Sequence, residues 1–304
     1  MTRAMQEISH SGFVAVVGRP SSGKSSFLNT LCGHKVSIVS PVPQTTQNCI
    51  RAIYNNANTQ LVFVDTPGIH ASERAYNRKL SKLARDAVTE ADAVLCLLDL
   101  SHSFGEEEKS VLLGLQAYAA RTVIACNKAD LVSPDVAEKR KADALEHIAP
   151  HAIVNMSAFS GKDVITVAET LGALLPSGPR LYPEEYYTDQ TQRHRIAEII
   201  REKIFLNLHE EIPHAACVLL EELVFNDETG KIKIRAAIYV ESESQKGIVI
   251  GGKGAMIREL GTSARADLGG IFGFDVDLFL RVLVRRGWRK DKTFLRLLER
   301  QYQG

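Results

Sequence analysis

One glycine-rich turn constrains the fold of this 304-residue chain more than any other feature. It reads Gly18-Arg19-Pro20-Ser21-Ser22-Gly23-Lys24-Ser25 and matches the pattern G-x-x-x-x-G-K-S/T. An apolar run over 13–17 precedes it, and a helical stretch over 24–31 follows it. In that setting the backbone N–H groups and the helix N-terminus point at phosphate oxygens. The turn therefore predicts a phosphate-binding loop, and its setting argues against a chance glycine-rich turn.

Apolar runs of strand length alternate with helical stretches from residue 12 to residue 174. The turn residues 55–58 join two of the strands as a hairpin. This alternation predicts an α/β domain with a mainly parallel six-stranded sheet, covered on both faces and with one antiparallel edge strand. The expected strands are 13–17, 49–54, 60–64, 93–98, 122–126 and 152–154, and the expected helices are 24–31, 76–90, 106–120, 134–148 and 163–174.

The sequence changes character near residue 176, where prolines accumulate and periodicity is lost. A chain of this length suits about two domains. We assign 1–11 to a flexible N-terminus, 12–175 to the first domain, 176–190 to a linker, and 191–304 to a second domain with a basic C-terminal tail.

The five cysteines have no paired spacing, which gives no support to a zinc site or a disulfide framework. No apolar run has the length of a signal-peptide core or a membrane span. A cytoplasmic location is the default expectation.

Two loops that follow predicted strands carry residues suited to a guanine base. Asn127-Lys128-Ala129-Asp130 follows one strand, and Ser157-Ala158 follows the next. A carboxylate at Asp130 can accept hydrogen bonds from the ring N–H and the exocyclic amine of guanine, whereas adenine would leave it unpaired. Such sites discriminate by roughly 10⁴ to 10⁵. We expect Asn127 and the stem of Lys128 to brace this loop, and the Ala158 N–H to bind the keto oxygen of the base, so the sequence favours GTP over ATP.

A metal site is expected near the phosphates. Ser25 offers a hydroxyl ligand for Mg²⁺, and Asp65 can hold the ion through a water. The Gly68 N–H can detect the γ-phosphate. Either Thr45 or Thr46 could complete the metal shell, and the sequence favours Thr46 only weakly.

These expectations define three residue sets. The metal ligands are Ser25, Thr46 and Asp65, and the catalytic set is Lys24, Thr46 and Gly68. The nucleotide-binding set is Gly18, Arg19, Pro20, Ser21, Ser22, Gly23, Lys24, Ser25, Ser26, Thr45, Asp65, Thr66, Pro67, Gly68, Asn127, Lys128, Asp130, Ser157 and Ala158.

These motifs, in this order over 12–174, resemble the translation-factor-like GTPases. Many relatives have a water-orienting glutamine where this chain has Ile69, so the resemblance implies slow intrinsic hydrolysis. We name no catalytic base, since His70 is better explained as an exposed loop residue. Related GTPases often use an asparagine at the position of Ser21 to help hold K⁺, so Ser21 makes K⁺ activation doubtful.

The second domain contains a G-x-x-G turn over Gly251–Gly254, with Lys253 inside it. Alone, such a turn could simply end a helix. The surrounding order favours an α+β type II KH domain, a module that clamps about four single-stranded nucleotides. That order is a helix over 193–209, strands over 216–225 and 231–240, a helix before the turn, a helix near 255–270 and a strand near 274–284.

The net charge of +1 conceals a segregation of charge. Residues 281–304 contain eight basic and two acidic residues, whereas 181–245 contain 7 basic and 13 acidic ones. A basic stretch can be a solvated face, but beside a G-x-x-G turn it indicates RNA. Trp288 could stack on a base or pack under the final helix. The expected RNA contacts are Lys246, Gly251, Gly252, Lys253, Gly254, Arg258, Arg285 and Arg286.

A phosphate-binding GTPase domain followed by a KH domain resembles the Era family over nearly the full length. Gln245-Lys246-Gly247-Ile248 and Gly287-Trp288-Arg289 are part of the likeness, although Gly251–Gly254 reads Gly-Gly-Lys-Gly where relatives usually have Gly-Lys-Gly-Gly. The resemblance implies binding near the 3′ end of small-subunit (16S-type) ribosomal RNA, a part in 30S subunit biogenesis, and peripheral association with the inner membrane. The alternatives are an RNA-binding scaffold that uses GTP without productive turnover and a GTPase that assists tRNA modification.

Overall fold

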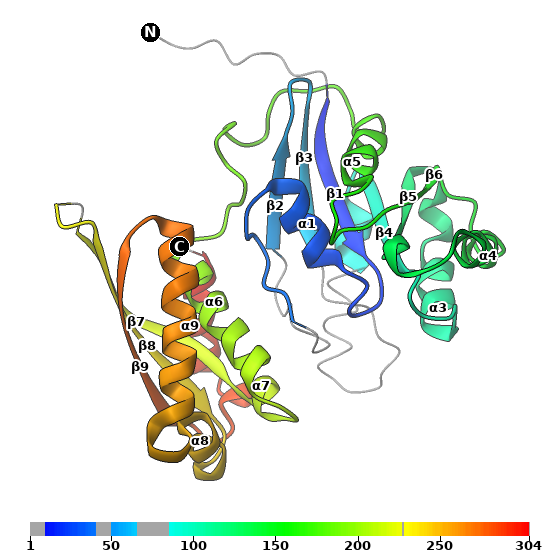
Figure 1. Cartoon of the computed structure of the whole chain (residues 1–304). Helices are drawn as coiled ribbons and strands as arrows, with labels where there is room; N and C mark the ends of the chain where they lie inside the picture. Colours follow the sequence, from blue (N-terminus) through cyan, green and yellow to red (C-terminus); the bar gives the residue numbers. More distant parts are fainter. Residues whose placement is uncertain (1–9, 41–49, 66–84, 227, 304) are drawn as a thin grey trace, which may run out of the picture. The chain divides into compact units, whose positions relative to one another are not determined.

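The computed structural model describes residues 10–65 except 41–49, and residues 85–303 except 227 (Figure 1). The chain forms two compact units. One contains Met1–Val39 and Pro43–Asp189, and the other contains Ser40–Val42 and Gln190–Gly304. None of the helices in the described part of the chain is both long and apolar enough to cross a bilayer.

The first unit is built on a six-stranded sheet in the order β2-β3-β1-β4-β5-β6. All neighbouring strands are parallel except β2 and β3, which form the hairpin at one edge. The predicted sheet is therefore confirmed. Its strands are β1 (His10–Val17), β2 (Ile50–Asn55), β3 (Thr59–Asp65), β4 (Ala93–Asp99), β5 (Thr122–Asn127) and β6 (Ala152–Asn155). His10 and Ser11, which the sequence assigns to a flexible N-terminus, are the first residues of β1.

Helices cover both faces of this sheet, which explains why its central strands are apolar throughout. α1 (Lys24–Cys32) and α5 (Val164–Gly172) pack on one face. α3 (Glu106–Gly114), α4 (Pro134–Leu145) and the helical residues 85–90 pack on the other. The helix expected over 106–120 ends earlier, at Gly114, and continues as a 3₁₀ turn over Gln116–Arg121. Of the helix expected over 76–90, residues 76–84 lie outside the described part.

The segment after α5 is attached to the first unit up to its end at Asp189. The Ile53 N–H donates to Tyr187 O at 3.0 Å, and Thr188 forms a bridge with Ala52. The buried Gln60 amide accepts from the Leu181 N–H and the Tyr182 N–H, at 2.7 and 2.9 Å. Most of the range that the sequence predicts as a linker therefore covers the otherwise open edge at β2.

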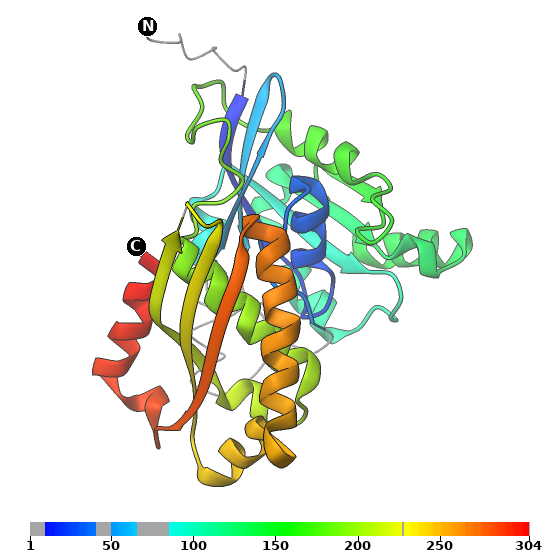
Figure 2. The ribbon, with the colours of Figure 1, turned by 60° about the vertical axis from the view of Figure 1, so that its left-hand side comes forward.

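The C-terminal unit has a three-stranded sheet in the order β7-β8-β9, with β7 and β8 antiparallel and β8 and β9 parallel. The order helix, two strands, two helices and strand confirms the type II KH fold. α6 and α9 pack on one face of this sheet, and α10 covers part of the other face (Figure 2). The elements are α6 (Gln192–Asn207), α7 (Ile212–Ala215), β7 (Cys217–Asn226), β8 (Lys231–Val240), α8 (Glu243–Ile250), α9 (Ala255–Phe272), β9 (Asp275–Val284) and α10 (Lys292–Gln303).

Candidate nucleotide and RNA sites

The phosphate loop between β1 and α1 has a backbone that its two glycines make possible. Gly18 has φ 148° and Gly23 has φ 94°, both in the region that side chains rarely adopt. A Cβ on Gly18 would lie 2.6 Å from Leu97 O, and one on Gly23 would lie 2.1 Å from Asn127 Nδ2. Ser21 is left-handed as well, with φ 60°. The loop is thus curled tightly against the ends of β4 and β5.

Lys24 begins α1 and lies inside the curl of the loop. Its side chain is buried, and Nζ donates to Gly18 O at 3.0 Å and to Arg19 O at 2.9 Å. Burial lowers the pKa of Lys24 to about 8, although the nearby Asp65 opposes this shift. The loop therefore holds a desolvated cation against two of its own carbonyl oxygens.

Asp65 ends β3 and is fully buried. Its Oδ2 accepts from Ser25 Oγ at 3.2 Å and from Ser37 Oγ at 3.1 Å, and the Ser37 contact is one that the sequence does not predict. Burial raises the pKa of Asp65, and Lys24 and the two serines oppose the rise. Oδ1 is buried with no hydrogen-bond partner within the described residues.

A buried carboxylate oxygen of this kind needs a partner. Together with the Ser25 hydroxyl it fits the oxygen ligands that Mg²⁺ prefers. The other residues expected at this end of the site lie outside the described residues, and they are Thr45, Thr46, Thr66, Pro67, Gly68, Ile69 and His70.

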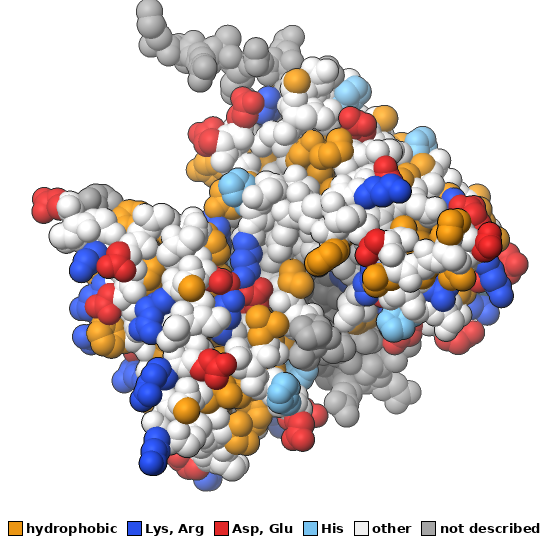
Figure 3. Space-filling view, in the orientation of Figure 1, with side chains coloured by type: hydrophobic (Ala, Val, Ile, Leu, Met, Phe, Trp, Pro, Cys, Tyr) orange, Lys and Arg blue, Asp and Glu red, His pale blue; other side chains and the backbone are white. Residues whose placement is uncertain are grey.

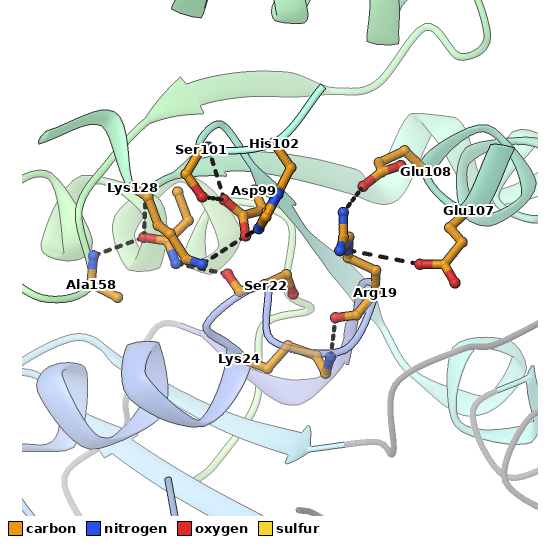
Figure 4. Close-up of polar contacts among 11 residues, drawn as sticks. Arg19, Ser22, Lys24, Asp99, Ser101, His102, Glu107, Glu108, Lys128 and Ala158 are labelled. Carbon is orange, nitrogen blue, oxygen red and sulfur yellow. Dashed lines mark hydrogen bonds and ion pairs between the residues drawn. The ribbon is translucent and has the colours of Figure 1, made fainter. Parts of the chain in front are cut away.

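Asn127 joins the three loops that the sequence predicts around the nucleotide (Figure 4). Its Nδ2 donates to Ser22 O at 2.8 Å, and its Oδ1 accepts from the Lys128 N–H at 2.8 Å and the Ala158 N–H at 2.9 Å. The sequence predicts that the Ala158 N–H binds the base. In the structure it donates to Asn127, so the first contribution of Ala158 is to bind the two base loops together.

The remaining base residues lie close by. Asp130 is exposed in the 3₁₀ turn Ala129–Leu131, and Ser157 is buried, where its Oγ accepts from the Ser160 N–H at 3.1 Å.

Asp99 is a site residue that sequence reasoning missed. Lys128 Nζ donates to Asp99 Oδ2 at 2.7 Å, while Asp99 Oδ1 accepts from the N–H and the hydroxyl of Ser101 at 2.9 and 2.6 Å (Figure 4). Burial alone would raise the pKa of Asp99, but the hydrogen bonds from Lys128 and Ser101 lower it below its usual value. Asp99 and Asn127 are paired at the ends of parallel β4 and β5. The sequence signal that could have found Asp99 is a carboxylate at the end of an apolar strand, where the next strand along the chain ends at Asn127.

Arg19 contributes to the phosphate loop through its backbone, because its side chain points away. Nη1 donates to Glu108 Oε1 at 2.9 Å, and Nε lies 3.9 Å from Glu107 Oε2 (Figure 4). Glu108 is buried and also accepts from the Gly105 N–H at 3.1 Å. The start of α3 is thereby fastened to the loop.

The G-x-x-G turn in the C-terminal unit joins α8 to α9. Gly251, Lys253 and Gly254 have φ values of 72°, 51° and 76°, and a Cβ on Gly251 would lie 2.8 Å from the Met256 N. The Gly251 N–H also caps α8 by donating to Gly247 O, so the turn ends one helix and presents Lys253 to solvent. Ile248 is exposed beside it, whereas Val249 belongs to the core and cannot meet a base.

Comparison with known proteins agrees with both halves of this description. Residues 13–128 match a family described as "50S ribosome-binding GTPase", and residues 211–289 match the KH domain. GTPase Era of Treponema denticola is 44% identical over 289 residues, which cover 94% of this chain and 98% of that protein. The chain belongs to the Era family of GTPases. It therefore hydrolyses GTP.

Further Era proteins support the assignment. GTPase Era of Thermotoga maritima is 42% identical, with 95% of this chain and 96% of that protein covered. A variant of Aquifex aeolicus Era bound to GDP and AlF₄⁻ superimposes with a TM-score of 0.88 at 31% identity, covering 95% of this chain and 98% of that one. An Era complex with MgGDPNP and nucleotides 1506–1542 of 16S ribosomal RNA gives the same TM-score at 32% identity and the same coverage.

The basic residues of the C-terminal unit fall into two groups, those without an ion-pair partner in the described part of the chain and those with one. Lys253, Arg258 and Arg286 are exposed and have no ion-pair partner among the described residues. Arg285 instead donates to Asp291 at 2.5 Å and lies over the Phe294 ring. Arg285 is therefore a weaker candidate for RNA contact than the sequence implies.

Trp288 packs inside the C-terminal unit. It is 7% exposed, lies against Phe294, and donates from Nε1 to Ala215 O at 3.0 Å. Of the two alternatives for Trp288, stacking on a base is wrong and packing is confirmed.

Proposed function

We propose that this Era protein is a GTP-dependent switch that binds small-subunit ribosomal RNA near its 3′ end and assists 30S biogenesis. One observation carries the proposal: a guanine-nucleotide site and an exposed G-x-x-G turn occur in a single chain. The Era complex with nucleotides 1506–1542 of 16S ribosomal RNA supports the choice of RNA.

The residues of the first unit have distinct parts in the reaction. The phosphate-loop amides and Lys24 bind the phosphates, and the added negative charge keeps Lys24 protonated despite its burial. Ser25 and Asp65 would hold Mg²⁺, with Thr46 or Thr45 as a further ligand. Mg²⁺ neutralises charge on the phosphate oxygens when it is bound. Gly68 detects the γ-phosphate, and with Ile69 in place of a glutamine the intrinsic hydrolysis is slow.

Base recognition falls to Asp130, which is exposed and has the acceptor oxygens that guanine requires. Asn127 holds its loop to the phosphate loop through Ser22 O. The Lys128 side chain is held by its hydrogen bond to Asp99. Ser157 and Ala158 belong to the second base loop, which the Ala158 N–H joins to Asn127 Oδ1.

Thr46 or Thr45 and Gly68 would contact the γ-phosphate or its Mg²⁺ when GTP is bound, and we propose that these contacts change RNA binding by the C-terminal unit. Nucleotide and RNA affinities are then reciprocally coupled. The test is a titration of a 16S 3′-end RNA into the protein loaded with GDP or with a non-hydrolysable GTP analogue. We expect different affinities, and equal ones would overturn the coupling. The alternative is an RNA-binding scaffold that uses GTP without productive turnover. Multiple-turnover phosphate release is measured with and without RNA, and sustained release would exclude that alternative.

Two further expectations follow from the resemblance. Turnover should not rise on exchanging Na⁺ for K⁺, because Ser21 replaces the asparagine. We also propose a cytoplasmic protein with peripheral association with the inner membrane surface, which a fractionation of cells with a salt wash would test.

A further inference from the structure

Three successive glutamates begin α3, and one of them is buried. Glu106 and Glu107 are exposed, whereas the Glu108 side chain is only 6% exposed. The helix dipole favours acidic residues in the first turn, which accounts for all three glutamates but does not require any of them to be buried. Figure 3 shows other Asp and Glu side chains at the surface around α3 and α4. Because a carboxylate is rarely buried unless it is paired, Glu108 needs a specific partner.

That partner is Arg19 of the phosphate loop. Glu108 Oε1 accepts from Arg19 Nη1 at 2.9 Å (Figure 4). Glu108 Oε2 accepts from the Gly105 N–H at 3.1 Å, so both carboxylate oxygens are used. The Arg19 side chain is 24% exposed, which means that this ion pair is mostly removed from water. Breaking such a pair leaves an uncompensated charge in a buried place, whereas an ion pair at the surface can be lost at little cost.

The backbone of Arg19 is constrained as well. Pro20 follows it, and a residue before a proline is restricted to extended conformations. The Arg19 carbonyl oxygen accepts from Lys24 Nζ at 2.9 Å and from the Ser22 N–H at 3.4 Å. Arg19 therefore joins Glu108, which its side chain contacts, to Lys24, which its carbonyl contacts.

These contacts determine in which direction the Lys24 ammonium can donate. A lysine ammonium has three N–H donors. Gly18 O and Arg19 O accept from two of them, which leaves one donor for a phosphate oxygen. Gly18 directly follows β1, so the sheet places its carbonyl, whereas the place of the Arg19 carbonyl depends on the attachment to Glu108.

We propose that Glu108 is a positioning residue for GTP hydrolysis, because it holds Arg19 and thereby the carbonyl that directs the Lys24 ammonium at the phosphates. This inference rests on the phosphate contact proposed above for Lys24. Glu108 acts through Arg19, so its loss misplaces the ammonium without removing it. A misplacement of about 1 Å in a reacting group can lower a rate by about 10²-fold.

The test is a double-mutant cycle on the full chain that combines Glu108→Gln with Lys24→Met. The measured quantity is kcat/KM for GTP under single-turnover conditions, in which slow variants can be followed. Glu108→Gln removes the charge that holds Arg19, but its amide oxygen can still cap α3 at the Gly105 N–H. Glu107→Gln is the matched control. It removes the same charge from the neighbouring position, where the carboxylate is 45% exposed and lies 3.9 Å from Arg19 Nε.

We expect Glu108→Gln to lower kcat/KM about 10- to 100-fold when Lys24 is present. In the Lys24→Met background the same substitution should change kcat/KM by less than about twofold, because no ammonium is left to position. Glu107→Gln should stay within about twofold of the parent in either background. Arg19→Gln should reproduce the loss, whereas Arg19→Lys can still donate to Glu108 and should recover part of the activity.

Three outcomes would overturn the inference. Equal losses from Glu108→Gln in the two backgrounds would show that Glu108 stabilises the loop without acting through Lys24. An unchanged kcat/KM in Glu108→Gln would remove its positioning role. An equal loss in Glu107→Gln would make the effect one of general charge at the start of α3. If Lys24→Met itself leaves kcat/KM unchanged, the proposed phosphate contact of Lys24 fails, and the inference fails with it.

Discussion

The lysine that we propose binds phosphate in the first unit and the lysine in the G-x-x-G turn of the second have opposite surroundings. Lys24 is buried, donates to two carbonyl oxygens and has its pKa lowered to about 8. Lys253 is exposed, with no ion-pair partner in the described part of the chain. We therefore expect the first site to select its ligand by fixed geometry and the second to attract its ligand by charge. The two sites should therefore respond differently to substitution and to salt.

Changing the base acceptor gives the strongest test of the geometric site. In Asp130→Asn the amide can donate where the carboxylate could only accept, which suits xanthine and opposes guanine. We expect the ratio of GTP to XTP affinity to change by a factor on the order of 10⁴. Competition binding with the two nucleotides measures it. RNA affinity of the nucleotide-free protein should not change, and an unaltered base preference would remove Asp130 from the base site.

Removing the buried cation should have the next largest effect. Lys24→Met keeps the length and the apolar stem but removes the charge, and we expect kcat/KM for GTP to fall roughly 10²- to 10³-fold. Because the charge acts inside a desolvated loop, this loss should not be recovered by changing ionic strength. If the loss of kcat/KM disappeared at high salt, the Lys24 charge would instead act like that of an exposed, salt-screened surface residue.

Lys24 also has a pH signature. Its folded pKa is below the unfolded value, so the stability of the nucleotide-free protein should rise as pH increases from about 8 toward about 10.5. Lys24→Met should lack this rise. Urea unfolding at several pH values would measure the difference, and identical profiles would contradict a lowered pKa.

Local sequence was enough to place Gly18, Gly23, Asp65 and Asn127, because each of these residues lies at the end of a strand or the start of a helix. It was not enough for the contacts that support them. Lys128 and Asp99 are 29 residues apart, and Arg19 and Glu108 are 89 apart, so their meeting depends on strand order. Likewise the charge count placed Arg285 at the RNA, whereas the fold brings Asp291 within 2.5 Å of it.

A contact that only the fold reveals can be tested at Asp99. Asp99→Asn removes the charge that holds Lys128 but keeps the shape, and we expect GTP to bind roughly tenfold more weakly. Because the folded pKa of Asp99 is lowered, its contribution to stability is present above about pH 4 and is lost as pH falls through the folded pKa. The variant should show less acid sensitivity than the parent in urea unfolding.

Asp99→Glu serves as the matched control. It keeps the charge and should recover part of the GTP affinity. Equal GTP affinity in Asp99→Asn and the parent would mean that Asp99 does not position the base loop.

The smallest expected effect concerns Ser21. Its side chain can be changed without disturbing the backbone of the phosphate loop. Ser21 is left-handed with φ 60°, a conformation that asparagine adopts more readily than most residues. Ser21→Asn should therefore fold normally and supply the amide that the resemblance to related GTPases associates with K⁺. We expect turnover of the variant to rise several-fold when K⁺ replaces Na⁺, while the parent stays unchanged. Strong K⁺ activation of the parent would show that Ser21 does not prevent a monovalent ion from assisting hydrolysis, and it would contradict our expectation.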